Sequence, residues 1–159
     1  MTKRRSIVMR VLIVAAGVFG AQAATAAVPA ADTPPITAAA ATDPQEVECM
    51  AKAIVREAGN QPERGQVAIA QVIRTRMKSG RFAPSACGVV KQRGQFFDPD
   101  AYNPSRTTSR WTNAIRIATE TLNGLGEEVA PGALFFRSAR ATLKQRIRIV
   151  QIADHIFYR

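Results

Sequence analysis

Residues 21–42 limit where this chain can build a hydrophobic core. Eleven of these 22 residues are Ala and three are Pro, a composition with no periodic apolar face and no large side chains to pack. We therefore expect residues 27–42 to form a flexible tether. The remaining segment, residues 43–159, has the length of one ordinary domain and contains no internal repeat.

The first 26 residues have the layout of a secretory signal peptide. A basic start precedes an apolar stretch at residues 11–19, and Ala-x-Ala sites follow at 21–23 and 24–26. A membrane-spanning helix needs about 20 apolar residues, so we expect cleavage, with an uncleaved anchor as the alternative. The predicted location is then the periplasm or the cell exterior, without stable membrane insertion.

The basic character of the chain survives this processing. Cleavage after Ala26 removes four basic and no acidic residues, and it leaves 18 basic and 12 acidic side chains. Such a charge would suit an anionic polymer, but export argues against nucleic acid as a partner. One His and two Cys in the whole chain are too few for an ordinary zinc site, so no metal or other cofactor is expected.

Cys49 and Cys87 are the only two cysteines. In an oxidising compartment we expect a disulfide between them, which would stabilise the fold by roughly 3 to 4 kcal/mol. Their spacing is not the Cys-x-x-Cys of a redox-active pair. Two buried free cysteines are the alternative.

Helical signals dominate the first two thirds of the domain. Asp43 as N-cap and Pro44 as the first helical residue begin one helix, with Glu46 placed to close a capping box. Glycine and asparagine end it at residues 59–60. The periodic apolar residues and stop signals predict further helices at about residues 62–79, 85–90 and 109–122, and an irregular loop at 92–106.

The last third changes character, because it holds three short runs rich in β-branched and aromatic residues, at 133–136, 147–152 and 155–158. These runs predict a small antiparallel sheet or hairpin. Ile147 and Ile149 alternate with arginines, as in a half-buried strand. A final helix is the alternative. The expected fold class is therefore α+β and mainly helical.

Glu57 is the acidic residue with the clearest chemical signal. It falls in the last turn of the first expected helix, where the negative end of the helix dipole and apolar neighbours both raise the pKa of a carboxyl group. A carboxyl group that keeps its proton near neutral pH can act as a general acid in glycoside cleavage. Glu48, in the N-terminal half of the same helix, is expected to be a solvated surface acid.

Seven motifs follow one another along the expected domain: Cys49–Ala58, Glu63–Ile73 with Arg76, Gly80–Phe82, Cys87–Val90, Gln92–Phe96, Gly132–Phe136 and His155–Tyr158. In this order they resemble the cell wall hydrolases of the spore cortex-lytic SleB/CwlJ type. The resemblance implies a lysozyme-like, transglycosylase-like fold. It also implies peptidoglycan as the partner, cleavage of its glycan strands, and Glu57 as the catalytic acid.

The chain departs from the family's pattern at several motif positions. Thr75 stands where Asn is usual, Phe97 and Asp98 stand where Ser and Trp are usual, and Arg137 replaces a His or similar polar residue. These departures bear on substrate preference.

The resemblance implies that Glu57 protonates the oxygen between N-acetylmuramic acid and N-acetylglucosamine. Capture of the resulting cation by the 6-hydroxyl of the muramic acid is the lytic transglycosylase outcome. This outcome is favoured because it needs no second carboxylate. Capture by water would use one, and Glu63, Asp98 or Asp100 could supply it. A non-catalytic peptidoglycan-binding module is the alternative function.

Sugars need amide hydrogen bonds and flat apolar faces. On this basis the expected groove-lining residues are Gln66, Gln95, Phe96 and Tyr102. For the two aromatic residues the alternative is ordinary packing, and His155 is expected to be a core or sheet histidine.

Six basic residues gather near the C-terminus, and they are Arg137, Arg140, Lys144, Arg146, Arg148 and Arg159. They predict either a solvated charged face or a surface that attracts the carboxylates of peptidoglycan stem peptides.

Overall fold

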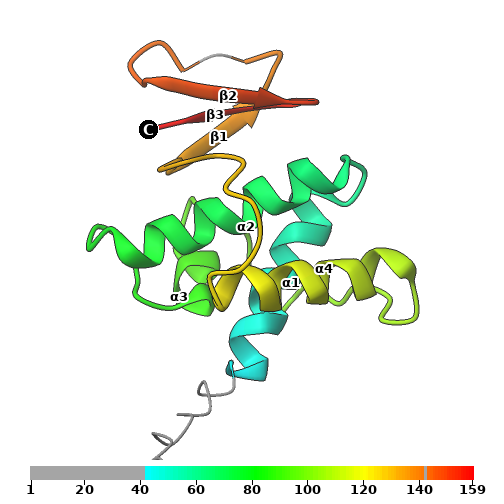
Figure 1. Cartoon of the computed structure of the whole chain (residues 1–159). Coiled ribbons are helices and arrows are strands. Elements are labelled where there is room, and N and C mark those ends of the chain that lie inside the picture. The colour runs from blue at the N-terminus through cyan, green and yellow to red at the C-terminus, as the bar shows by residue number, and fades with distance from the viewer. Residues whose placement is uncertain (1–41, 142) are drawn as a thin grey trace, which may run out of the picture. The chain divides into compact units, whose positions relative to one another are not determined.

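The structure is a computed structural model that describes residues 42–141 and 143–159. The predicted signal peptide, and the predicted tether except Thr42, lie outside the described residues. Within these residues, four helices precede three strands (Figure 1). They are α1 Pro44–Ala58, α2 Glu63–Lys78, α3 Ala86–Lys91, α4 Ser109–Leu122, β1 Phe135–Ser138, β2 Arg148–Ile152 and β3 His155–Tyr158. The prediction of a mainly helical α+β domain is confirmed.

Helix α1 begins as the sequence predicts. The Asp43 side chain accepts a hydrogen bond from the Gln45 backbone N–H at 2.8 Å, and Pro44 is the first helical residue. The predicted capping box is wrong, because the Glu46 carboxylate instead accepts the backbone N–H groups of Ala86 and Cys87. Those amides open α3, where the first N–H groups of a helix lack intrahelical acceptors and favour a negative charge.

The core forms where α1 packs against each of the other three helices. Its large side chains, all of them almost fully buried, are Met50, Ile54, Ile69, Ile73, Val72, Val89, Val90 and Ile117. These residues fall at the helical spacing of the sequence, so each helix presents one apolar face to the centre.

The disulfide between Cys49 and Cys87 joins α1 to α3, as predicted. It lies beside the contact that Glu46 makes with the same end of α3. A helix of only six residues is thus held by a covalent bond, a carboxylate and its apolar face.

The C-terminal strands form an antiparallel sheet with the order β1-β3-β2. The alternative of a final helix is therefore wrong. The predicted alternation of Ile147 and Ile149 is also wrong at its start, because Ile147 is 70% exposed and precedes β2. An irregularity between Arg148 and Val150 shifts the register there, and such a bulge breaks the two-residue period on which the prediction relied.

The sheet lies on the same side of the helices as α2 (Figure 1). The Gln61 side chain exchanges hydrogen bonds with Asp154 at 3.1 and 3.2 Å. At the other end of α2, Arg76 Nε donates to the Leu134 carbonyl oxygen at 2.7 Å. These bonds fix the sheet to both ends of one helix and position the groove described next.

Candidate active site

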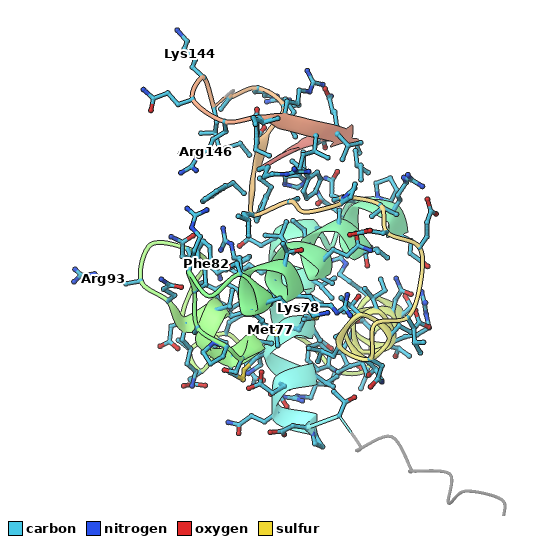
Figure 2. The ribbon with its side chains drawn as sticks, turned by 60° about the vertical axis from the view of Figure 1, so that its left-hand side comes forward. Met77, Lys78, Phe82, Arg93, Lys144 and Arg146 are labelled. Carbon is cyan, nitrogen blue, oxygen red and sulfur yellow. A yellow bond between two sulfur atoms is a disulfide. The ribbon has the colours of Figure 1, made fainter. Side chains whose placement is uncertain are left out.

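A groove of about 640 Å³ lies between the helices and the sheet. Its lining residues come from the end of α1, from α2, from the loop after α3, from the sheet and from the loop between β1 and β2. They are Glu57, Arg76, Gly94, Gln95, Phe135, Phe136, Arg137, Ser138, Leu143, Arg146 and His155. In Figure 2, Lys144 and Arg146 extend from the loop between β1 and β2, above Phe82, and Arg93 projects from the helical side.

Glu57 is the penultimate residue of α1 and is half-buried in this groove. Its carboxyl group makes no ion pair or hydrogen bond with any residue that the structure describes. Burial raises the pKa of Glu57, and the neighbouring charge of Arg56 opposes the shift. The predicted position of Glu57 is confirmed, and so is the predicted direction of its pKa.

Glu48 on the same helix behaves in the opposite way. The Arg106 guanidinium binds both its oxygens at 2.7 and 3.2 Å, and Lys52 lies at 3.1 Å. The hydrogen bond from Arg106 is the largest cause that lowers the pKa of Glu48 to about 2. One helix therefore carries a carboxyl group in its N-terminal half whose pKa is lowered and another near its C-terminal end whose pKa is raised.

The burial of Glu57 predicts a pH-dependent effect on stability. A folded-state pKa above the ordinary value of 4.5 means that stability is complete below that value and is lost as the pH rises through the folded-state pKa. Glu57→Gln should therefore unfold at a higher temperature than wild type at neutral pH, and the gain should shrink in acid. Thermal unfolding at a series of pH values measures this, and a gain that grew toward acid would contradict it.

Of the two expected groove-lining residues in the loop after α3, only Gln95 lines the groove, and its side chain is half-buried. Phe96 is not among the lining residues. It packs against the core with its ring 5.9 Å from the ring of Phe136, which agrees with the alternative of ordinary packing. The structure thus brings Gln95 together with Glu57, and Phe96 supports the aromatic wall.

Gln66 lies elsewhere. Its Nε2 donates to the Gln61 carbonyl oxygen at 3.0 Å, and its Oε1 accepts from Asn113 at 3.1 Å. Gln66 lines a separate hollow with Arg110 and Asn113. Both ends of this buried amide are occupied, so the structure gives it a role in joining α2 to α4.

Tyr102 also lies outside the groove lining. Its ring packs edge-on against Phe97 at 5.3 Å, and the Arg56 guanidinium lies over both rings, at 4.7 Å from Phe97 and 5.4 Å from Tyr102. The alternative of ordinary packing describes Tyr102 better than a role in the groove.

The other candidate carboxylates are engaged away from Glu57. Glu63 pairs with Arg116 at 2.8 Å. Asp98 accepts the backbone N–H of Asp100 at 3.0 Å, and Asp100 pairs with Lys91 at 2.8 Å. None of the three acids lines the groove.

Of the three departures from the family's motifs, one reaches the groove. Arg137 is exposed on β1 and lines it. Thr75 lines a different hollow, beside Arg74 and Gly124, and Phe97 lies in the contact with Tyr102. Only Arg137 therefore stands where it could meet a ligand bound beside Glu57.

Arg76 is a groove residue that the sequence patterns did not single out. It is only 3% exposed, and its guanidinium lies 4.8, 5.1 and 5.7 Å from the rings of Phe82, Phe96 and Phe135. Burial lowers the pKa of Arg76 to about 10, so it remains charged at neutral pH. Arg76 belongs to one of the seven motifs that resemble the family, and through that motif the sequence could have indicated a functional role.

His155 also lines the groove, although the sequence suggested only a core or sheet role. It begins β3, and its ring packs edge-on against Phe136 at 5.5 Å. Burial lowers the pKa of His155, with Asp154 acting in the opposite direction. The side chain is therefore neutral at neutral pH.

Within residues 42–141 and 143–159, no group of three or more His, Cys, Asp or Glu side chains is arranged to hold a metal ion. No helix in the same residues is long and apolar enough to cross a bilayer.

Among the described residues, the open groove is lined by one carboxyl group, that of Glu57, which can take up a proton. This arrangement defines the class of protein. The family model described as cell wall hydrolase matches residues 60–158. The chain belongs to the cell wall hydrolase family, which is a family of enzymes.

Two solved structures with this fold are catalytic domains of SleB proteins. The catalytic domain of Bacillus cereus SleB superposes with a TM-score of 0.61 at 26% identity, over 74% of this chain and 91% of that one. The catalytic domain of the germination-specific lytic transglycosylase SleB from Bacillus anthracis gives 0.63 at 25% identity, over 77% and 100%. The fold and family expectations are confirmed.

A spore cortex-lytic enzyme from Oceanobacillus iheyensis is 28% identical over 132 residues, which is 79% of this chain. The match covers 45% of that enzyme, so this chain spans less than half the length of the relative.

Proposed function

We propose that this protein cleaves the glycan strands of peptidoglycan at the bond between N-acetylmuramic acid and N-acetylglucosamine, as a lytic transglycosylase. The observation that carries the proposal is the isolation of Glu57. It is the one acidic side chain among the described residues that line the groove, and burial favours its protonated form.

Glu57 first acts as a general acid. Its proton passes to the glycosidic oxygen, the bond from that oxygen to C1 of the muramic acid breaks, and positive charge develops on the sugar ring. The 6-hydroxyl of the same sugar then forms a bond to C1 and gives its proton to the Glu57 carboxylate. The products are a 1,6-anhydro end and a free N-acetylglucosamine end, and Glu57 is protonated again.

This route needs no second carboxylate, whereas capture by water is served by one on the opposite face of the sugar. Glu63 and Asp98 would be the partners for water, but each is engaged outside the groove. The lytic transglycosylase activity named for the Bacillus anthracis relative also supports the anhydro route.

The rest of the groove suits a saccharide. The amide of Gln95 offers a donor and an acceptor to hydroxyl and acetamido groups. The ring of Phe136, which also lines the groove, provides apolar surface for a sugar face. A volume of about 640 Å³ is in the range of small-molecule sites.

Location and processing belong to the same proposal. Residues 1–26 would direct export and be cleaved, residues 27–42 would form a tether, and residues 43–159 would act on the wall from the periplasm or cell exterior. Peptidoglycan is the proposed partner.

The test is mass spectrometry of muropeptides released when the protein is incubated with purified sacculi. We expect fragments with 1,6-anhydro ends. Reducing ends would mean that the protein hydrolyses the bond and is not a transglycosylase. Intact sacculi that still bind the protein would favour the non-catalytic binding module.

A further inference from the structure

The lining of the groove has an excess of positive charge. Arg76, Arg137 and Arg146 face it, and Glu57 is the acidic residue beside them. The single carboxyl group of Glu57 can offset at most one of the three guanidinium groups. His155 also lines the groove and adds no negative charge.

Some arginines elsewhere on the surface are neutralised by acidic partners. Arg64, Arg106 and Arg116 each pair with a glutamate at 2.7 to 2.9 Å. Arg137 and Arg146 form no ion pair with any residue that the structure describes. These two guanidinium groups are therefore free to meet an anion in the groove.

Arg146 is also oriented. Its guanidinium lies over the ring of Phe135 with its carbon 3.9 Å from the ring centroid. In Figure 2 it extends from the loop between β1 and β2 on the side where Phe82 and Arg93 lie. Stacking on an aromatic face leaves the edge of the guanidinium plane, with its N–H groups, available to an acceptor. The side chain is thus held ready for a planar anion.

The anion must belong to the polymer that lies in the groove, because both arginines line the same surface as Glu57. N-acetylglucosamine offers hydroxyl and acetamido groups, which carry no charge. Muramic acid also has a lactyl carboxyl group, but an attached peptide stem converts that group to a neutral amide. In stem-bearing peptidoglycan the free carboxylates therefore belong to the peptide stems. Guanidinium groups bind carboxylates through paired N–H donors.

We propose that the groove selects glycan strands that carry peptide stems, and that Arg137 and Arg146 bind the stem carboxylates next to the bond to be cleaved. This inference rests on the proposed function for its substrate. The inference does not extend to all six basic residues near the C-terminus. Arg148, for example, donates to Gln151 at 2.7 Å and does not line the groove.

The experiment compares two preparations of the same sacculi. One is native, and in the other the stem carboxyl groups are converted to amides with a carbodiimide and ammonia. Sedimentation of the full chain with each preparation measures binding without requiring cleavage. We expect wild type to bind native sacculi about tenfold more tightly, which is the effect of one or two lost charge-assisted hydrogen bonds. The difference should diminish as salt is raised.

The double variant Arg137→Gln, Arg146→Gln should bind both preparations alike. Arg148→Gln removes a charge from the same sheet outside the groove, so it should keep the wild-type discrimination. Circular dichroism verifies that the variants fold. Equal wild-type binding to both preparations would overturn the inference. Discrimination that survived in the double variant would also overturn it. So would competition by heparin that is as effective as competition by soluble stem-bearing muropeptides.

The same assay separates this inference from the proposed function. Glu57→Gln should bind with full discrimination while releasing no muropeptides. If wild type discriminated between the preparations but never cleaved either, then the catalytic proposal would fail and the carboxylate site would stand.

Discussion

Replacing Glu57 with Gln is expected to reduce the release of muropeptides from sacculi by about 10²- to 10⁴-fold, the usual contribution of a general acid or base. Gln has nearly the same shape and hydrogen-bonding capacity as a protonated Glu, but it has no acidic proton to transfer. The groove should therefore remain folded and able to bind. Initial rates of muropeptide release, together with sedimentation on sacculi, measure both properties.

The matched control is Glu63→Gln. Glu63 is exposed, pairs with Arg116 at 2.8 Å and does not line the groove, so turnover should change by less than about threefold, as expected for a surface substitution. A loss comparable to that of Glu57→Gln would bring Glu63 into the chemistry and contradict the route without a second carboxylate. Unchanged turnover in Glu57→Gln would exclude Glu57 as the acid.

Removing the disulfide is expected to have the largest effect on stability. Cys49 and Cys87 are 38 residues apart, and closing a loop of that length in the unfolded chain is worth about 4 kcal/mol on the chain-entropy model. The double variant Cys49→Ala, Cys87→Ala should lose about that much free energy of unfolding. Denaturant unfolding at equilibrium measures it.

A reducing agent provides the control for this variant. It should destabilise wild type toward the level of the double Ala variant and leave that variant unchanged. A loss below about 1 kcal/mol in the variant would mean that Glu46 and the apolar face hold α3 without the covalent bond, against the loop-closure argument.

Local signals account for what could be predicted from the sequence. Asp43 and Pro44 determine the start of α1 through contacts within one turn, and the apolar periodicity of the helices fixes which faces are buried. The last-turn position of Glu57 and its apolar neighbours suffice to predict a raised pKa. Its catalytic role remains a prediction.

Contacts between residues far apart in the sequence account for most of what could not be predicted. Glu46 finds the amides of Ala86 and Cys87 about 40 positions away, which no capping pattern encodes. Arg76 reaches the Leu134 carbonyl 58 positions away, so its place in the groove depends on how the sheet docks. Gln66 has the right chemistry for a sugar, but its side chain is occupied by partners on two other segments.

The bond from Arg76 to Leu134 has a consequence for how the groove meets a ligand. It ties the helical wall to the residue that precedes β1, and the buried guanidinium is wedged among three aromatic rings. The helical wall and the sheet wall of the groove cannot move apart or together without breaking this hydrogen bond. The groove is therefore preorganised, and a polymer that enters it should bind with little loss of conformational entropy by the protein.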